Sequence, residues 1–243
     1  MVSTTSFALQ NTKPDNKQGA YVRLVEGKSE EEKRKLYLEA LANPDCGWFF
    51  RCKTSDFNKI PGAPIAYWVG EVLVSAFNKK YSIGDCLETR EGLTTGNNDK
   101  YLRLWYECPQ NSIGYGINST EDSVRSLKKW FPYVKGGEYR RWYGNNDYVV
   151  NWYNDGEEQK KNIDEVTGRV RSHNYNGSYG FRTGLTWSGI GMGFFSVRHV
   201  NAGFMFDAKG PMGFAKAGYD LDNIECYLNS TITRELLKIL APT

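Results

Sequence analysis

The feature that most constrains the fold is a central stretch, from about residue 83 to residue 206, that is rich in Gly, Asn, Tyr and Trp. Its β-type runs are short and fall at residues 101–107, 147–152, 194–200 and 204–206. Long turn-rich segments separate these runs. We therefore predict a loop-rich, mostly β domain over residues 81–218, and loops of this length favour a binding surface over a bare scaffold.

Both flanks of this stretch carry the patterns of regular elements. Ser29 and Glu32 have the spacing of a capping box, in which a serine oxygen accepts a bond from a free backbone amide and a glutamate reaches back. The flanking patterns predict strands at residues 4–10, 19–25 and 47–52, and helices at residues 29–42, 64–79 and 220–240. The expected fold class is α+β, with strands and helices in residues 1–80 and a C-terminal docking helix in residues 219–243.

The positive charge of the chain is concentrated. The net charge of +3 is too small to indicate nucleic-acid binding by itself. Between residues 166 and 218, however, Asp207 is the only acid beside six basic residues, so this stretch carries +5 and the remaining residues sum to −2. Such clustering is typical of a surface that faces a polyanion. The alternative is a chance asymmetry among exposed loops.

The cysteines and the apolar runs bear on where the protein works. The five cysteines are odd in number and form no CxxC pair. No window approaches the ~18 apolar residues of a membrane span, and the N-terminus lacks the pattern of a secretion signal. We therefore expect reduced thiols, no membrane partner and a cytoplasmic protein.

The residue constellations of common enzymes are missing. His173 and His199 are the only histidines, and neither lies in a spaced metal motif, so both are expected to be lone histidines. We find no GxSxG, no phosphate-binding GxxxxGK[ST], and no GxGxxG that opens a helix. No catalytic residue is assigned, and the chain alone is expected to be inactive.

Residues 130–153 combine nine aromatic residues with basic and amide side chains. The interleaved polar residues are Lys135, Arg140, Arg141, Asn145 and Asn146. Aromatic rings can stack on bases, arginine can bind phosphate or guanine, and asparagine can pair with adenine. The alternative is that most of these rings form the core of the β domain.

A second segment, residues 90–103, carries two glycines and two asparagines just before a predicted strand. Gly92, Gly96, Asn97 and Asn98 permit tight backbone angles that bring amides close to a phosphate. An ordinary turn before a strand is the alternative.

Several segments together resemble a known family. They are residues 59–68, 92–103, 129–146, 184–188, 203–207 and 228–230. In these segments the chain resembles the PglX family, the adenine-specific DNA methyltransferases of BREX phage-exclusion systems, and more distantly TaqI-like and fused restriction-methylation enzymes. The resemblance implies a methyltransferase domain followed by a target-recognition domain, with S-adenosylmethionine as the methyl donor and an Asn-Pro-Pro-Tyr-type motif for the flipped adenine.

This chain departs from that pattern at the catalytic motif. Its only Asn-Pro pair, Asn43-Pro44, lacks the second proline and the stacking aromatic. The resemblance therefore implies a part that lacks the catalytic and cofactor motifs, with residues 1–80 as the end of the methyltransferase domain and residues 81–218 as the target-recognition domain. S-adenosylmethionine is expected for the full-length family and not in this chain.

By resemblance, the loop at residues 92–103 lies close to DNA, and other candidates follow from their chemistry. The loop candidates are Thr95, Asn97, Asn98, Lys100 and Arg103; the others are Lys135, Arg140, Arg141, Asn145, Asn146, Arg169, Arg171, His173 and Arg182. The expected partners are double-stranded DNA, the methyltransferase catalytic domain and other phage-defence proteins. One alternative is a protein-interaction module that binds defence subunits or a phage inhibitor, and another is a sugar-binding module.

Overall fold

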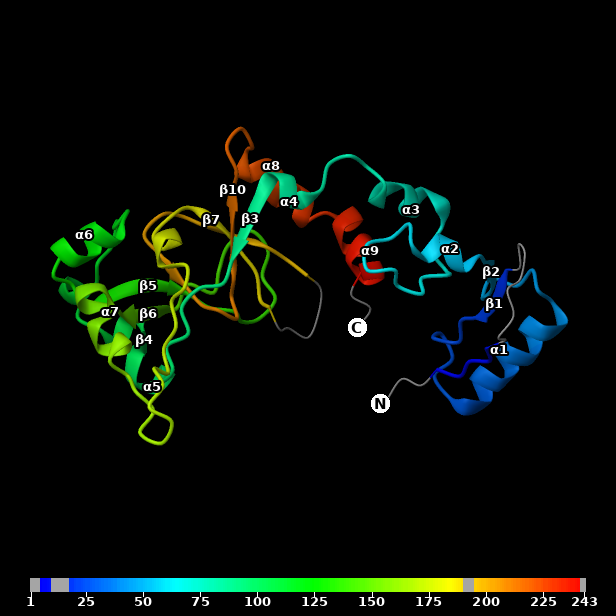
Figure 1. The fold of residues 1–243 in the computed structure, drawn as a ribbon, viewed down its shortest axis with the longest axis horizontal. Helices are drawn as coiled ribbons and strands as arrows, with labels where there is room; N and C mark the ends of the chain where they lie inside the picture. The colour runs from blue at the N-terminus through cyan, green and yellow to red at the C-terminus, as the bar shows by residue number, and fades with distance from the viewer. Residues whose placement is uncertain (1–4, 10–17, 190–194, 241–243) are drawn as a thin grey trace. The chain divides into compact units, whose positions relative to one another are not determined.

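The structure is a computed structural model that describes residues 5–9, 18–189 and 195–240. The chain divides into two compact units, the first formed by Met1–Lys80 with Leu236–Thr243, and the second by Tyr81–Glu235 (Figure 1). Helices and several small sheets are mixed along the chain, which confirms the α+β class. Among the described residues, no helix has the length and apolar character needed to cross a membrane.

The first unit contains a two-stranded sheet and a capped helix. Strand β1 (Gly19–Val22) pairs antiparallel with β2 (Phe49–Cys52), and α1 (Glu30–Ala42) lies between them in sequence. The Ser29 hydroxyl accepts a 3.1 Å hydrogen bond from the Glu32 amide, as predicted. The Glu32 carboxylate accepts a 2.7 Å bond from the Lys28 amide, one residue before the position expected in a capping box.

Two expectations for the first unit are wrong. The described part of the predicted strand 4–10, residues 5–9, has no regular structure, and β1 pairs with β2 instead. The predicted helix 64–79 is limited to α3 (Glu71–Phe77), while a short helix, α2 (Thr54–Phe57), precedes it.

Tertiary contacts of Tyr67 and Trp68 explain why the second helix begins late. The Tyr67 ring stacks on Tyr21 of β1 with 4.6 Å between centroids, and the guanidinium of Arg23 lies 4.2 Å from the Trp68 ring. Consecutive residues of a helix point in different directions, so a helix would not let both rings reach the segment that contains β1. Nearby, Ala66 packs with Ile60 and with Ile239 of α9 (Thr231–Leu240) in the core of this unit.

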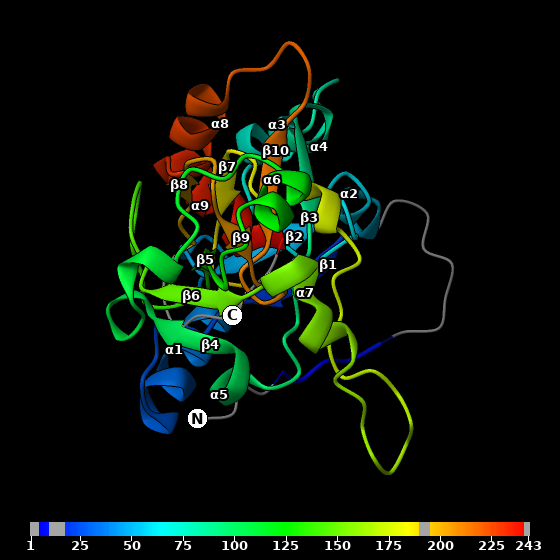
Figure 2. The same ribbon diagram turned by 90° about the vertical axis from the view of Figure 1, so that its left-hand side faces the viewer.

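The second unit is built on two four-stranded sheets. We call one the β5 sheet; its order is β4 (Leu102–Leu104), β6 (Tyr148–Asn151), β5 (Trp130–Val134) and β9 (Met205–Phe206), with β5 and β9 parallel and the other pairs antiparallel. The other, the β10 sheet, is antiparallel with order β3 (Leu87–Arg90), β10 (Met212–Ala215), β7 (Gly184–Thr186) and β8 (Arg198–Val200). Figure 2 shows the β5 sheet toward the viewer, with α5 and α7 beside it.

Short helices connect these strands. They are α4 (Ile83–Cys86), α5 (Asn98–Tyr101), α6 (Thr120–Arg125), α7 (Tyr153–Lys160) and α8 (Leu221–Leu228), with 3-10 turns at Trp105–Glu107, Gln110–Ser112 and Gly177–Tyr179. The strand predicted at 147–152 is present as β6, and that at 204–206 as β9. The run 101–107 is a strand only at β4, and the run 194–200 only at β8, while Phe194 lies outside the described residues.

The aromatic residues of 130–153 divide between core and surface. Phe131, Tyr133 and Trp152 are buried in the main core of the β5 sheet, together with Phe181. The residues exposed to solvent are Tyr139, Trp142, Tyr143 and Tyr153. Because burying a ring is strongly favourable, rings that stay outside the core are candidates for a binding surface.

The C-terminal helix predicted at residues 220–240 is two helices, α8 and α9, that meet at Asn229 and Ser230. Asn229 is buried, and its side-chain amide donates to the Val197 carbonyl oxygen and accepts from the Val197 amide, each at 3.0 Å. A continuous helix would lose this two-point contact with the segment before β8. The break is therefore set by a tertiary contact that the helical periodicity does not reveal.

We predict that Asn229→Ala destabilises the protein by about 2–4 kcal/mol, because it leaves two buried backbone groups of Val197 without partners. Denaturant unfolding followed by circular dichroism measures this loss. The matched control is Asn223→Ala, which truncates an exposed asparagine of the same helix and should change stability little. Equal stability of the two variants would show that the contact does not hold α8 in place.

Candidate nucleic-acid interface

A pocket lined by aromatic rings opens on one face of the β5 sheet, with a volume of about 290 Å³. Its floor is the cross-strand pair Pro132 and Val149, which are in register between β5 and β6. Neighbouring residues of β5, Phe131 and Tyr133, point into the core, as the alternation of a strand requires. Pro132 and Val149 therefore lie on the sheet face opposite the main core, whereas Tyr148, which is in register with Tyr133, also packs against that core.

The walls of this pocket, which we call the aromatic pocket, come from segments that are separate in the sequence. They are formed by Trp105, Tyr115, Tyr143, Tyr148 and Phe204, with Asn146 beside them. Trp105, Tyr115 and Tyr143 are 50%, 53% and 68% exposed, so their faces are available to a ligand. The side-chain oxygen of Asn146 is buried and has no hydrogen-bond partner. A volume at the low end for ligand sites suits one planar group with polar edges.

Two cations lie next to residues that line the aromatic pocket. Arg103 of β4 is in register with Val149 of the floor and so lies on the same sheet face. Its guanidinium is 5.7 Å from the ring of Trp130. The Lys135 ammonium lies 5.3 Å from the ring of Tyr148, which lines the pocket. The pocket thus combines stacking rings, an unpaired amide oxygen and flanking positive charge.

The loop between β5 and β6 carries both pocket residues and the arginine pair. Arg140 and Arg141 are exposed, and two backbone bonds dock the loop on the β10 sheet: the Trp142 amide donates to the Val197 carbonyl oxygen at 3.1 Å, and the His199 amide donates to that of Trp142 at 2.7 Å. Within the loop, the Asn145 side-chain amide donates to the Glu138 carbonyl oxygen at 3.0 Å. These contacts fix the position of the loop that carries both the arginine pair and the pocket residues Tyr143 and Asn146.

A second group of candidates forms where two other loops pair. The backbones of Thr94 and His173 exchange hydrogen bonds of 2.8 and 2.9 Å, which joins the segment after β3 to the segment that contains Arg169 and Arg171. Asn97 and Asn98 are exposed, as is Lys100. His173 stacks on Tyr175 with 5.4 Å between ring centroids. This group presents amide and basic side chains to solvent.

Some candidates in this group have local structural roles. Thr95 is only 3% exposed, and its hydroxyl donates to the Asn98 side-chain oxygen at 2.6 Å, so it positions its neighbour and is not a surface residue. The Asn97 side chain caps α5 by accepting from the Lys100 amide at 3.0 Å. Gly96 has φ of +71°, and a Cβ there would lie 2.7 Å from the Arg171 side chain, so this turn requires glycine.

Arg171 is held by an acid. Asp164 lies 2.7 Å from the Arg171 Nη2 atom and 3.1 Å from its Nε atom, and it also accepts from the amides of Val166 and Thr167. The hydrogen bonds from Thr167, with that from Arg171, lower the pKa of Asp164 to about 2. The charge of Arg171 is therefore partly neutralised by Asp164. Arg169, two residues earlier, is exposed and has no such ion pair among the described contacts.

Arg182 lies apart from both the aromatic pocket and the paired loops at Thr94 and His173. Its guanidinium lies 5.0 Å from the ring of Tyr179 and 5.3 Å from that of Phe214, on the β10 sheet. Arg90 also approaches Tyr179, at 4.8 Å from the ring, and Glu88 bonds both Arg90 and the Tyr179 hydroxyl. Arg182 is exposed, but it is built on different elements from the aromatic pocket.

Two neighbouring residues of β8 correct the sequence interpretation. Arg198, counted above with the surface charge, is 1% exposed, its Nε and Nη2 atoms have no partner, and burial lowers its pKa. His199 is not a lone histidine, because Asp222 and Glu225 of α8 lie close to its Nδ1 atom. No sequence pattern identified the pocket residues Trp105, Tyr115 and Phe204 as site candidates, because single aromatic residues far apart in the sequence form no motif.

Comparisons with known proteins connect the whole chain to one group of enzymes. No family model matches it. The chain is 43% identical over 244 residues to the adenine-specific methyltransferase PglX of Lacticaseibacillus casei (strain Zhang), a match that covers 100% of the chain and 20% of that protein. The chain is a homologue of one segment of PglX-type methyltransferases. The resemblance inferred from the sequence is thereby confirmed.

A second relative of the chain is the adenine-specific methyltransferase BrxX of Escherichia coli O9:H4 (strain HS). The two are 32% identical over 246 residues, which is 100% of the chain and 18% of BrxX. The chain thus spans about a fifth of the length of the curated relatives it matches.

The Asp164–Arg171 pair can be tested by titration. A carboxyl group with a pKa of about 2 contributes stability that is present above its ordinary pKa of 3.8 and is lost as pH falls through 2. We expect the Asp164 carboxyl carbon to titrate near pH 2 by NMR, and Arg171→Ala to raise that midpoint toward 3.8. Arg169→Ala is the matched control and should leave it unchanged. A midpoint near 3.8 in the unaltered protein would contradict the pairing.

Proposed function

We propose that this chain is the DNA-binding target-recognition part of an adenine-specific DNA methyltransferase of the phage-defence type, a BREX component. The observation that carries the proposal is the aromatic pocket, with exposed rings around the unpartnered Asn146 oxygen and with Arg103 and Lys135 next to two of its lining residues, Val149 and Tyr148. The relatives supply the enzyme class, because both are adenine-specific methyltransferases.

Each component of the pocket suits one part of DNA. Exposed rings such as Tyr143 can stack on a base regardless of its identity. An asparagine amide can bond a base edge, and adenine offers it a two-point partner. The basic residues contribute phosphate contacts, which fix register and supply most of the affinity without reading sequence. Arg140, Arg141 and Arg169 are exposed and can serve in this way.

The methyl-transfer site belongs, in this proposal, to the part of the relatives that the chain does not cover. The Asn43-Pro44 pair of this chain does not fit a base-holding motif, because Asn43 ends α1 and its side chain accepts a 3.2 Å bond from the Asp45 amide. We therefore assign no residue here to S-adenosylmethionine and expect the chain alone to bind DNA without methylating it. The expected place of action is the cytoplasm, where a bacterial defence protein meets DNA.

Salt dependence tests the phosphate contacts. We expect the chain to bind a DNA duplex in a fluorescence anisotropy titration, with affinity that falls steeply as salt rises. Because each lost phosphate contact reduces the slope of log K against log salt by about 0.9, Arg140→Ala combined with Arg141→Ala should reduce it by about 1.8. The matched control replaces Lys160 and Lys161, another adjacent basic pair, which α7 and its end place beside Asp155 and Glu157. Absence of binding at low salt, or equal slopes for the two double variants, would contradict the proposal.

Ring substitutions test the aromatic pocket itself. Tyr143→Ala should weaken duplex binding by about 1–3 kcal/mol, the usual worth of one base–ring stack, whereas Tyr143→Phe should retain most of the affinity. Tyr153→Ala removes another exposed tyrosine that does not line the pocket and is the control. Asn146→Ala should reduce discrimination among duplex sequences more than affinity for any one duplex. If Tyr153→Ala and Tyr143→Ala weaken binding equally, the pocket is not the contact.

A second candidate function is docking of another protein, such as a defence subunit or a phage inhibitor. It is favoured by a groove of about 490 Å³ between α4 and α8, lined by Tyr81, Tyr219, Tyr227 and Ile224 among others. Aromatic rings are enriched where proteins meet. Capture of a partner that survives nuclease treatment and is lost in Tyr227→Ala would favour this function, whereas loss on nuclease treatment would favour DNA.

A further inference from the structure

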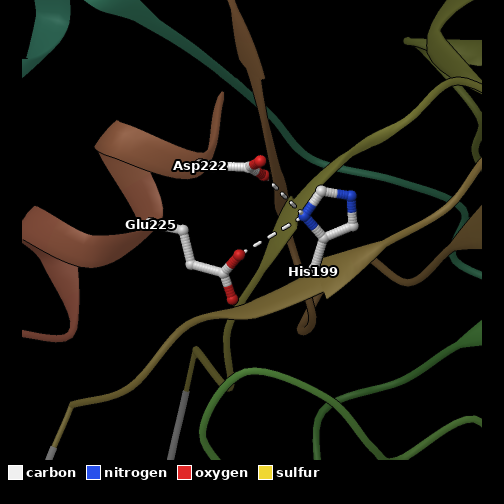
Figure 3. Close-up of side chains that lie close together, drawn as sticks. All are labelled: His199, Asp222 and Glu225. Atoms are coloured by element: carbon white, nitrogen blue, oxygen red, sulfur yellow. Dashed lines mark hydrogen bonds and ion pairs between the residues drawn. The ribbon is translucent and has the colours of Figure 1, made fainter. Parts of the chain in front are cut away.

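His199, Asp222 and Glu225 bring one imidazole and two carboxylates together on the β10 sheet (Figure 3). The His199 Nδ1 atom lies 3.3 Å from the Glu225 Oε2 atom and 3.7 Å from the Asp222 Oδ1 atom. All three ligand atoms lie within 4.8 Å of one another. Figure 3 shows both carboxylates of α8 approaching the same nitrogen of the ring.

The fold fixes this arrangement through a packed helix. Asp222 and Glu225 are three residues apart on α8, so both side chains lie on one helix face. The same helix packs Ile224 and Leu228 against Leu185 and Val197 of the β10 sheet region. His199 is in register with Leu185, and it therefore lies on the sheet face that α8 covers. The Asn229 contact with Val197 closes the far end of this packing.

The Glu225 carboxylate is poorly compensated by the protein alone. The residue is 6% exposed, and its Oε1 atom is buried without a hydrogen-bond partner. The ion pairs of Asp222 and Glu225 among the described residues are both with His199, and an imidazole is a cation only when it is protonated. An ionised carboxylate that is buried in this way is stabilised by a positive charge close to it.

We propose that His199, Asp222 and Glu225 bind one divalent transition-metal ion, with zinc as the best fit and water completing its coordination. Ligand atoms about 2.0–2.2 Å from a tetrahedral zinc are about 3.3–3.6 Å apart, close to the two separations of 3.3 and 3.7 Å from the His199 Nδ1 atom, while the two carboxylate oxygens lie within 4.8 Å of each other. An imidazole ligand favours zinc over magnesium or calcium, which prefer oxygen atoms alone. Asp222 is 80% exposed, so its side chain can adjust and water can reach the ion.

A bound ion would join α8 to β8. Strand β8 is also bonded to the loop of the candidate interface. The His199 amide donates to the Trp142 carbonyl oxygen at 2.7 Å, in the loop that carries Arg140 and Arg141. The site is nevertheless built from residues that take no part in the proposed DNA contacts. The metal site therefore goes beyond the proposed function and does not depend on it.

Calorimetric titration of the chelator-treated full chain with Zn²⁺ tests the site. We expect one ion per chain and a rise in the thermal unfolding midpoint at saturating zinc. Asp222→Asn, an exposed substitution that should leave the fold intact, and His199→Ala should each weaken zinc binding by about tenfold or more. With Co²⁺ in place of zinc, the unaltered chain should show visible ligand-field absorption that His199→Ala abolishes.

Two matched variants separate this site from other zinc ligands of the chain. His173→Ala removes the other histidine, and Cys226→Ser removes an exposed thiol on the same helix. Both should bind zinc as the unaltered chain does. Absence of stoichiometric binding would overturn the proposal, and so would binding that survives His199→Ala and Asp222→Asn or that is lost in either matched variant.

Discussion

Single backbone bridges hold the long loops of the second unit to its two small sheets, and the candidate interface depends on them. A buried peptide group without a partner is costly, so a loop-rich domain must pair its loops with each other or with strand edges. Thr94 pairs with His173, and Trp142 with the backbone around Arg198. The buried Tyr133 hydroxyl adds a link, 2.9 Å from the Leu93 carbonyl oxygen and 3.0 Å from the Asp207 carboxylate. Burial raises the pKa of Tyr133 well above its usual range, which keeps this donor protonated.

Strand alternation and these bridges together explain why some aromatic residues of this region are buried while others, close in sequence, are exposed. Strand alternation sends Phe131 and Tyr133 into the core, while Pro132 between them forms the floor of the aromatic pocket. Tyr143 lies in a loop that backbone bonds of Trp142 dock on the β10 sheet, and its own side chain is not buried. Its face therefore remains open to a ligand. The pairing of loops positions a surface that composition alone could only suggest.

The sequence predicts what depends on neighbours in the chain and misses what depends on distant contacts. The Ser29 cap and the strand β6 follow from local patterns. The late start of α3 and the break at Asn229 could not, because they are set by Tyr21 and Val197 elsewhere in the chain. In the candidate interface, residue chemistry selected Asn146 and Arg103; Asn146 lines the pocket with Trp105, and strand pairing places Arg103 beside Val149 of its floor. Thr95 and Arg198 were misjudged because burial is not visible in charge or polarity.

In the proposed function, the aromatic pocket and its flanking loops are the surface that contacts DNA. Hydrogen–deuterium exchange of the full chain, with and without a saturating duplex at low salt, tests this most directly. We predict slower exchange in the peptides that contain Trp105, Tyr115 and residues 139–148, with little change in α1 and α6. Slower exchange confined to α4 and α8, or no change at saturation, would contradict it.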